Sequence, residues 1–447
     1  MLNSSTKEAI KVALSIIVAL CLAIWFQWEK PYWAAIAVGV MALNETFAHA
    51  INKGYNRLIG TLLGTVFAFI LISMFSQNPT LFLSIFTLLL AFSIFMSSDE
   101  QYGYIFSMAF TVCAIVSCMG QFDGETTFYF AILRFQETML GVVTYSVIFQ
   151  LLWPVNTEKG FSQKFTEAVE ELIASIHKPQ LTEEGVHESI ANIEMLRKIL
   201  NMPLTGSYVL RHHRKHWIQR IAEMRAIYGA LQQRLESSEV NWTALLDSLE
   251  QFDSKHPQLS LLSEGVGIVA NDPSTSWHQE KRTFIQHLHQ DYKRVMQGVC
   301  MFLASIVIWI YLPVPGGAIF PMLAGILASQ LPTLPPTTIR DAAMGVLGTG
   351  SVVLLEYVFI MPYFTELWQL ALFYFVNTLV IWELFSSPPL MIHRILGINL
   401  LVVLTSGALN LTPVYSIEMP LFMMVNILMM LMIAKIFTDI FNPAPHR

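Results

Sequence analysis

Two ionisable residues, Arg134 and Glu137, lie one helical turn apart within a long, mainly apolar stretch of the chain. A charged side chain at the centre of a membrane helix costs about 2.5–3.5 kcal/mol on insertion scales, so such residues usually have a function. We interpret Arg134 as an anion-binding residue and Glu137 as a neighbour that can gain or lose a proton. The structural alternative is an internal ion pair that only stabilises the helix.

Three more arginines are candidates for binding or attracting an anion. Arg57 and Arg340 lie where two apolar stretches begin, at matching places in the two halves of the chain, and Arg394 is the third. Cations that face one cavity raise the local concentration of an anionic substrate. We expect the first two to meet in one basic mouth; the alternative is that their long side chains only reach for the membrane surface.

Three further residues are candidates for proton coupling together with Glu137. Glu356 lies near the far end of the apolar stretch that follows Arg340, and Glu45 and His49 are one helical turn apart. Catalysis has less support, because the sequence contains no nucleophile–base set, no GxxxxGK[ST] loop for ATP and no Cys/His metal spacing. The sequence therefore predicts a protein that is not an enzyme and holds neither a metal nor a cofactor.

The composition indicates the class of protein in which these residues lie. Of the 447 residues, 54% are hydrophobic and only 13% are charged, about half the charged fraction of an average soluble protein. Residues 157–295 hold 16 of the 26 Lys/Arg and 18 of the 32 Asp/Glu, and the net charge of −6 offers no basic surface to nucleic acid. We predict an all-α polytopic membrane protein with membrane blocks at 1–156 and 294–447 and a helical cytoplasmic domain at 157–293.

Each membrane block contains six mainly apolar stretches, and a spanning helix needs about 20 such residues. The first block predicts spans at Ile10–Trp28, Tyr32–Leu43, Leu58–Phe75, Pro79–Phe95, Tyr102–Met119 and Thr126–Trp153. The second block predicts spans at Val295–Leu312, Ala318–Leu331, Ile339–Met361, Thr365–Trp382, Leu390–Leu409 and Met419–Phe441.

The distribution of Lys and Arg orients the predicted helices, since cytoplasmic loops carry more of both. With the N-terminus inside, Lys30 is the only basic residue of the outer loops, and the inner side holds Lys7, Lys53, Arg57, Arg340, Arg394 and the whole middle domain. We therefore expect both termini and residues 157–293 in the cytoplasm. Trp33 then falls in the aromatic belt of the outer membrane surface.

The two membrane blocks resemble each other in sequence. Pro31 is followed by Arg57 and then by a Leu-Leu-Gly-Thr run, whereas Pro315 is followed by Arg340 and then by Val-Leu-Gly-Thr. Because both blocks start on the same side with the same number of helices, we predict two parallel six-helix repeats related by an axis along the membrane normal, as transporters use.

Small residues recur at matching places in the two blocks. Gly60 and Gly64 form a GxxxG pattern in an apolar helix, and Gly345 and Gly348 make the corresponding helix of the second block similarly slim. Such spacing lets a neighbouring helix approach closely. We assign these glycines to helix packing.

The run Arg57-Leu58-Ile59-Gly60-Thr61-Leu62-Leu63-Gly64, after Pro31-Tyr32-Trp33-Ala34, resembles the start of the fusaric acid resistance and aromatic acid exporter family. The order of six spans, a helical cytoplasmic part and a second membrane block is also similar. The resemblance implies an efflux component of the bacterial inner membrane for aromatic carboxylic acids, working with a periplasmic adaptor of the membrane-fusion type. Many members continue after the second block, so an end at Arg447 puts dimerisation or regulation through such a part in question.

We expect a protein embedded in the lipid bilayer that exports small, mainly aromatic, organic acids by proton-driven secondary transport. Arg57, Arg134 and Arg340 would attract or bind the carboxylate, while Glu137 or Glu356 would titrate. One alternative is a passive organic-anion channel lined by the same basic residues, and another is a membrane scaffold that recruits cytoplasmic partners. Assembly into a homo-oligomer is compatible with the sequence.

Overall fold

The computed structural model describes residues 3–42, 47–99, 102–120, 124–153, 157–177, 183–201, 210, 212–222, 224–225, 284–387, 390–410 and 412–441. All regular secondary structure in these segments is helical, and no strand occurs within them. The predicted all-α class is therefore confirmed. Chain contacts divide the protein into two compact units, one formed by Met1–Glu45, Lys53–Trp153 and Thr283–Arg447, the other by Thr46–Asn52 and Pro154–Arg282.

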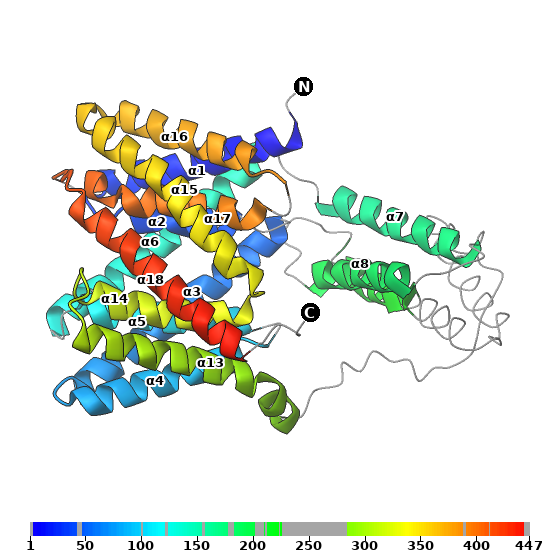
Figure 1. Ribbon diagram of the computed structural model, residues 1–447. Helices are drawn as coiled ribbons and strands as arrows, with labels where there is room; N and C mark the ends of the chain where they lie inside the picture. The colour runs from blue at the N-terminus through cyan, green and yellow to red at the C-terminus, as the bar shows by residue number, and fades with distance from the viewer. Residues whose placement is uncertain are drawn as a thin grey trace. The chain divides into compact units, whose positions relative to one another are not determined.

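The larger unit contains the apolar helices of both predicted membrane blocks. The first block consists of α1 (Ser4–Trp25), α2 (Tyr32–Ala42), α3 (Phe47–Phe75), α4 (Pro79–Met96), α5 (Gly103–Met119) and α6 (Gly124–Leu151). The second consists of α13 (Phe284–Tyr311), α14 (Ile319–Gln330), α15 (Thr337–Phe359), α16 (Leu367–Leu384), α17 (Met391–Leu404) and α18 (Glu418–Phe441). These helices run side by side in one bundle (Figure 1).

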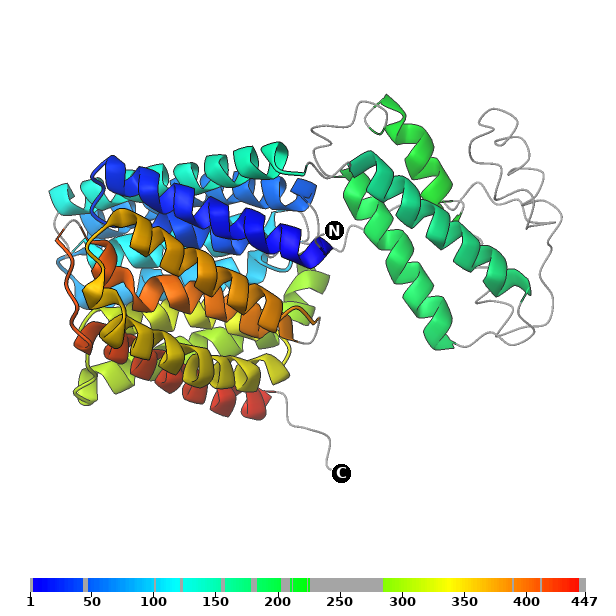
Figure 2. The same ribbon diagram turned by 90° about the horizontal axis from the view of Figure 1, so that it is seen from above.

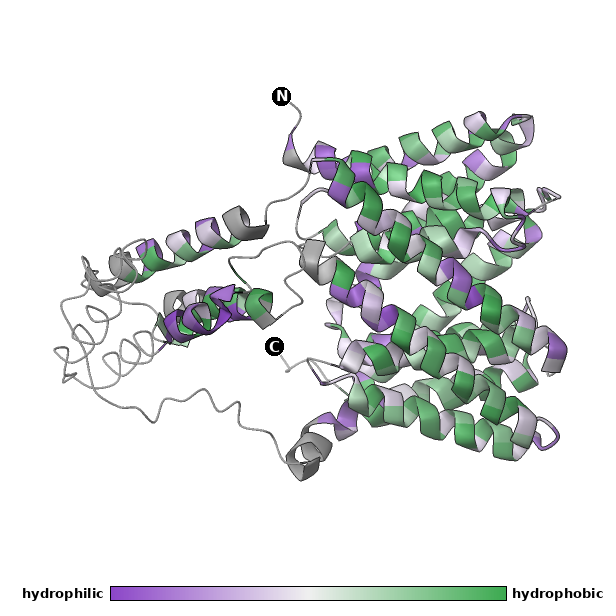
Figure 3. Ribbon diagram, turned by 180° about the vertical axis from the view of Figure 1, so that it is seen from behind, coloured by the Kyte–Doolittle hydropathy of each residue, from purple (hydrophilic) through white to green (hydrophobic). Residues whose placement is uncertain are grey.

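Seven of the described helices are long and apolar enough to cross a membrane, namely α1, α3, α4, α13, α15, α16 and α18. The helices α2, α5, α14 and α17 are apolar but shorter. Hydrophobic residues cover the sides of the bundle, whereas hydrophilic residues gather at its ends (Figure 3). The protein is thus a polytopic membrane protein, and the count of twelve spans stays a prediction. The helix α6 has 28 residues, which is long enough to cross a membrane, but it is not among these seven helices. It carries the buried ionisable residues Arg134 and Glu137.

The two blocks pack against each other in a reciprocal pattern. The first helix of each block contacts the fourth helix of the other, as α1 does with α16 and α13 with α4. The second helix likewise contacts the fifth helix of the other block, as α2 does with α17 and α14 with α5. A two-fold axis between parallel repeats would produce this reciprocity, so the packing supports the predicted repeats, which stay a prediction.

The helix α1 begins and α18 ends at the same end of the bundle (Figures 1 and 2). The buried ammonium group of Lys11 in α1 donates a hydrogen bond of 2.7 Å to the carbonyl oxygen of Trp153, just after α6. A cation is stabilising where the carbonyl groups of a helix end are left without intrahelical donors. Lys11 therefore fastens the end of α6 to α1.

Glycines bring two pairs of helices into close contact. A Cβ atom added at Gly60 would lie 2.8 Å from the carbonyl oxygen of Ile105 in α5, and one at Gly64 would lie 2.2 Å from that of Ala109. Gly141 of α6 lies equally close to α2, since its added Cβ would be 2.6 Å from the carbonyl oxygen of Ala34. Only a residue without a side chain fits at such distances.

The two glycines named in the second block behave differently from this pattern. A Cβ atom at Gly345 would lie 3.2 Å from His393 Nδ1, which is a tight side-chain contact. At Gly348 no atom of the described residues lies within 4 Å of an added Cβ, so the predicted close packing is not found among them at this glycine. The spacing of the glycines suggested a helix neighbour that the fold does not place there.

The smaller unit is helical in its described part, where α7 (Thr157–His177) packs against α8 (Glu183–Asn201). Phe161, Phe165 and Leu172 form the buried face of α7, and Ser189 of α8 donates a 2.5 Å hydrogen bond to Glu171. Residues 226–283 of the predicted cytoplasmic domain lie outside the described residues.

Candidate functional site

A small cavity, with a free volume of about 10 Å³, lies among α2, α5 and α6, beside the connection that follows α1. Since α1 starts at the end of the bundle where the chain begins, this connection belongs to the opposite end. One carboxylate, two basic groups and several aromatic and aliphatic side chains line the cavity: Glu137, Lys30, Arg134, Trp33, Phe130, Ile115, Val116, Met119 and Leu133.

The guanidinium group of Arg134 stacks on Trp33 in this cavity. Its Cζ atom lies 3.4 Å from the centre of the indole ring, and the arginine is only 4% exposed. The close approach of α6 to α2 at Gly141, two turns beyond Arg134, explains this contact. A cation over an indole face is attracted by the π electrons, and more strongly where water is excluded.

Arg134 and Glu137 are close, but they do not satisfy each other's hydrogen-bonding groups. The distance from Arg134 Nη1 to Glu137 Oε2 is 3.9 Å, which is the outer limit of an ion pair. Among the described residues, Arg134 Nε and both carboxylate oxygens of Glu137 are buried without a hydrogen-bond partner. Leaving such an atom unpaired costs about 1–3 kcal/mol, and more for a charged group. The pair therefore retains donors and acceptors for a bound molecule.

Lys30 supplies the second cation at the mouth of the cavity. It lies in the connection between α1 and α2, is half-buried, and has its Nζ atom 4.2 Å from the centre of the Phe130 ring. Burial lowers the pKa of Lys30, while the negative charges of Glu137 and Glu29 act in the opposite direction. A carboxylate bound beside Lys30 would raise this pKa again, because opposite charge favours the protonated amine.

Arg57 is a further buried cation, outside the lining of the cavity. It lies on α3, is 6% exposed, and donates a 3.3 Å hydrogen bond from Nη1 to the hydroxyl of Tyr104 on α5. Lys53, one turn earlier, has its Nζ atom 5.2 Å from the centre of the same tyrosine ring. The charge of Arg57 is close enough to act on Arg134. Burial of Arg57 does not fit the snorkelling alternative.

The other two arginines are placed differently. The side chain of Arg340 is 75% exposed and lies 3.5 Å from Asp341, its neighbour in the chain. Arg394 is half-buried, with its Cζ atom 4.5 Å from the centre of the Trp382 ring. Neither lines the cavity with Arg134. Arg57 and Arg340 thus differ in burial and in partners, although they occupy matching places in the sequence.

This difference predicts unequal effects of removing the two arginines. We expect Arg340→Gln to change the KM for an anionic substrate by less than about five-fold, because an exposed ion pair contributes about 0.2–1 kcal/mol. Arg57→Gln should raise the KM more and weaken its dependence on salt, since a buried charge near the site is less screened. Transport kinetics in inside-out vesicles at two salt concentrations measure both effects. Equal, small changes in both variants would remove Arg57 from the site.

The remaining candidates for proton coupling do not line the cavity. Glu356 lies on α15, where it is half-buried and its Oε2 atom has no hydrogen-bond partner among the described residues. His49 lies in α3, but its side chain is not described, and Glu45 lies outside the described residues. Glu137 is therefore the one candidate carboxylate whose described position is beside the two cavity cations.

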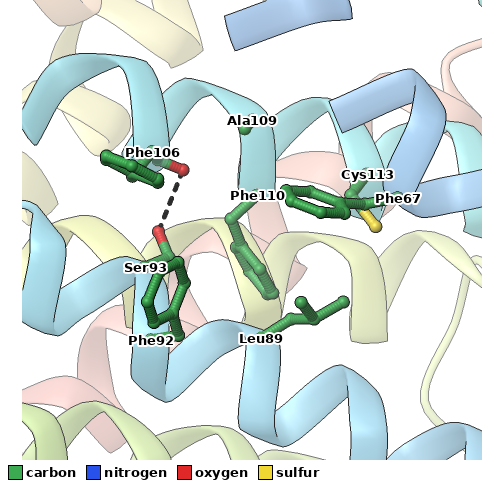
Figure 4. Close-up of a pocket in the computed structure, with 8 residues that line it drawn as sticks. All are labelled: Phe67, Leu89, Phe92, Ser93, Phe106, Ala109, Phe110 and Cys113. Carbon is green, nitrogen blue, oxygen red and sulfur yellow. Dashed lines mark hydrogen bonds between the residues drawn. The ribbon is translucent and has the colours of Figure 1, made fainter. Parts of the chain in front are cut away.

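A second small cavity, also with a free volume of about 10 Å³, lies among α3, α4 and α5 (Figure 4). Its lining is apolar apart from Ser93, which donates a 3.1 Å hydrogen bond to the carbonyl oxygen of Phe106. No charged side chain occurs among the described residues that line this cavity. It has nothing to compensate a carboxylate, so it does not compete with the first cavity for an anion.

The sequence indicated two of the three charged residues of the site. Arg134 and Glu137 stood out as ionisable residues in an apolar stretch, whereas Lys30 was assigned to an outer loop and Trp33 to an aromatic belt. Phe130 carried no signal, because phenylalanines are frequent throughout the chain. The isolation of Lys30 as the only basic residue of the predicted outer loops was the available signal.

Comparison with known proteins assigns the chain to a family. The model of the fusaric acid resistance protein family matches residues 8–291, which include every residue of the cavity. The chain belongs to this family. The family resemblance predicted from the sequence is thereby confirmed.

Curated relatives of this family member match a smaller part of it. A p-hydroxybenzoic acid efflux pump subunit AaeB from Musicola paradisiaca is 28% identical over 156 residues, covering 32% of this chain and 24% of the relative. The subunit of the same name from Shigella boydii is 26% identical over 183 residues, covering 39% and 27%. The matches thus span about a quarter of the relatives' length. No solved structure matches the chain.

Proposed function

We propose that this family member exports small aromatic carboxylic acids across the bacterial inner membrane. The observation that carries the proposal is the cavity itself, which holds two cations, an unsaturated arginine–glutamate pair and aromatic rings. The names of the curated relatives, which are efflux pump subunits for p-hydroxybenzoic acid, agree with this substrate class.

The lining fits an aromatic carboxylate in chemical terms. A guanidinium group can bind a carboxylate through two parallel hydrogen bonds, and such charge-assisted bonds are about twice as strong as neutral ones. Arg134 has an unpaired Nε–H for this purpose, and Lys30 can add a third positive donor. The rings of Trp33 and Phe130, together with Ile115, offer apolar surface for the ring of the substrate.

Proton coupling at Glu137 stays a prediction, and the charges indicate its sign. Protonation of Glu137 removes a negative charge beside Arg134 and therefore strengthens the binding of an anion. A proton at Glu137 and the anionic substrate would therefore bind together. Exchange of a proton for the substrate would instead require that protonation weaken the binding of the substrate. A proton antiporter would need a second titrating group, for which Glu356 remains the candidate.

The membrane potential offers a driving force without proton exchange. Moving one negative charge out of a cell that is negative inside releases about 2.3 kcal/mol per 100 mV, equivalent to a concentration ratio of roughly 50-fold. This sign argument favours the second candidate function, a passive channel for organic anions that uses the same cavity. Flux measurements separate the two functions, since flux through a channel follows the potential and the anion gradient and needs no proton gradient.

The test is flux of a radiolabelled aromatic acid such as benzoate into proteoliposomes. We impose a potential at equal pH, then a pH gradient at zero potential, with empty liposomes as the control. A potential-driven, saturable flux supports the export of the anion, and an added response to pH supports coupling to protons. Flux no faster than in empty liposomes under both conditions would contradict the proposed function.

The remaining features of the export system are proposals as well. We place the N-terminus, the C-terminus and residues 157–293 in the cytoplasm, because Lys and Arg are concentrated on that side of the predicted spans. In this orientation the cavity opens toward the periplasm, where an adaptor of the membrane-fusion type would receive the substrate. A homo-oligomer is compatible with the apolar sides of the bundle.

A further inference from the structure

We propose that Glu137 makes the site selective for substrates with a single negative charge. This inference rests on the proposed function, because it concerns the charge of the exported acid. Among the described lining residues, Lys30 and Arg134 are basic and Glu137 is acidic. With Glu137 ionised, these three residues carry a net charge of one, which one carboxylate neutralises.

Charges farther from the cavity do not alter this balance. Arg57 acts on Arg134 from the side of α3, and Glu29 acts on Lys30 from the connection after α1. These two charges are opposite in sign and lie outside the lining. The uncharged hydroxyl of Tyr32 also acts on Arg134.

The geometry of Glu137 indicates a role in charge balance more than in holding the helices together. Its side chain is fully buried, yet neither carboxylate oxygen has a hydrogen-bond partner among the described residues, and the nearest cation is 3.9 Å away. A carboxylate that fixes a fold normally accepts short, charge-assisted hydrogen bonds. Glu137 instead compensates one of two cations and leaves the other for a ligand.

The charge balance discriminates among ligands of similar shape. A monocarboxylate gives a neutral complex, and a dicarboxylate leaves one negative charge buried without compensation. A neutral amide leaves the positive charge unpaired. Buried, unpaired charges are strongly unfavourable. Benzoate should therefore bind more tightly than both benzene-1,3-dicarboxylate and benzamide.

The experiment measures the affinities of benzoate and benzene-1,3-dicarboxylate for the purified full-length protein in nanodiscs. We expect Glu137→Gln to shift the ratio of the two affinities toward the dicarboxylate by at least about ten-fold, because removing one unit charge a few ångströms away has at least this effect at an effective dielectric of 20. Glu125→Gln is the matched control, since Glu125 lies on the same helix, is exposed, and should leave the ratio unchanged.

A second variant decides the question if Glu137→Gln fails to fold. Lys30→Gln changes a half-buried residue in a connection and lowers the net charge of the lining to zero. It should weaken benzoate binding and shift the preference toward benzamide. An unchanged affinity ratio in a folded Glu137→Gln protein, or an unchanged preference in Lys30→Gln, would overturn the inference. Absence of benzoate binding in the unmodified protein would instead overturn the proposed function.

Discussion

Arg134→Gln is expected to abolish saturable binding of aromatic carboxylates, with a loss of affinity of at least about 100-fold. The arginine offers a buried, desolvated guanidinium group that stacks on Trp33 and keeps an unpaired donor. A hydrogen bond to a charged group contributes about 1.5–3 kcal/mol, so two lost bonds account for this factor. Isothermal titration with benzoate measures the loss directly.

The same substitution leaves Glu137 as a buried carboxylate without its nearest cation. Breaking a buried pair in this way destabilises a protein by about 3–5 kcal/mol, which could mask the effect on binding. The double variant Arg134→Gln/Glu137→Gln is the control, because it removes both charges together. We expect it to recover thermal stability without recovering binding. A double variant that binds and transports like the unmodified protein would return the pair to a structural role.

Gly64→Val is expected to prevent the accumulation of folded protein. A Cβ atom at this position would lie 2.2 Å from the carbonyl oxygen of Ala109 and 2.9 Å from the Cβ atom of Val112. Backbone atoms of α5 cannot move aside as a flexible side chain does, so the cost should exceed the roughly 1–3 kcal/mol of ordinary overpacking. Fluorescence size-exclusion chromatography in detergent measures the folded fraction.

Gly348→Val provides the matched comparison for Gly64→Val. Gly348 lies in α15, at the place in the second block that the sequence matched with Gly64, but no atom of the described part of the chain lies within 4 Å of its added Cβ. Valine is also a better helix former than glycine. This variant should reach at least the folded yield of the unmodified protein. Equal yields of the two valine variants would contradict the tight contact between α3 and α5.

The sequence predicted the helical class and the elements of the bundle well, because apolar runs of membrane length are distinctive. The helix α4, for example, spans Pro79–Met96, one residue longer than its predicted span. The helix α3 was less predictable at its start, since it begins at Phe47 and its polar first turns give no apolar signal. A helix boundary that lies outside an apolar stretch depends on contacts with neighbouring parts of the fold, so the apolar pattern does not predict it.

The candidate site could be predicted only in part from the sequence. A charged residue in an apolar helix is unusual enough to identify Arg134 and Glu137 on its own. The contribution of Trp33 depends on the packing of α2 against α6, which no local pattern encodes. Arg340 occupies the place in the second block that matches Arg57, yet it is exposed whereas Arg57 is buried. A matching position in the sequence therefore does not determine burial.

The glycine contacts have a consequence for how the cavity could open. At Gly64 the helix α3 lies against the backbone of α5, and at Gly141 the helix α6 lies against the backbone of α2. Both contacts are too close for a side chain to fit between the helices. The cavity has Trp33 and Arg134 on one of these helix pairs and Ile115 on the other. Substrate passage would then separate the two helix pairs at the cavity, and each pair would move as one rigid body.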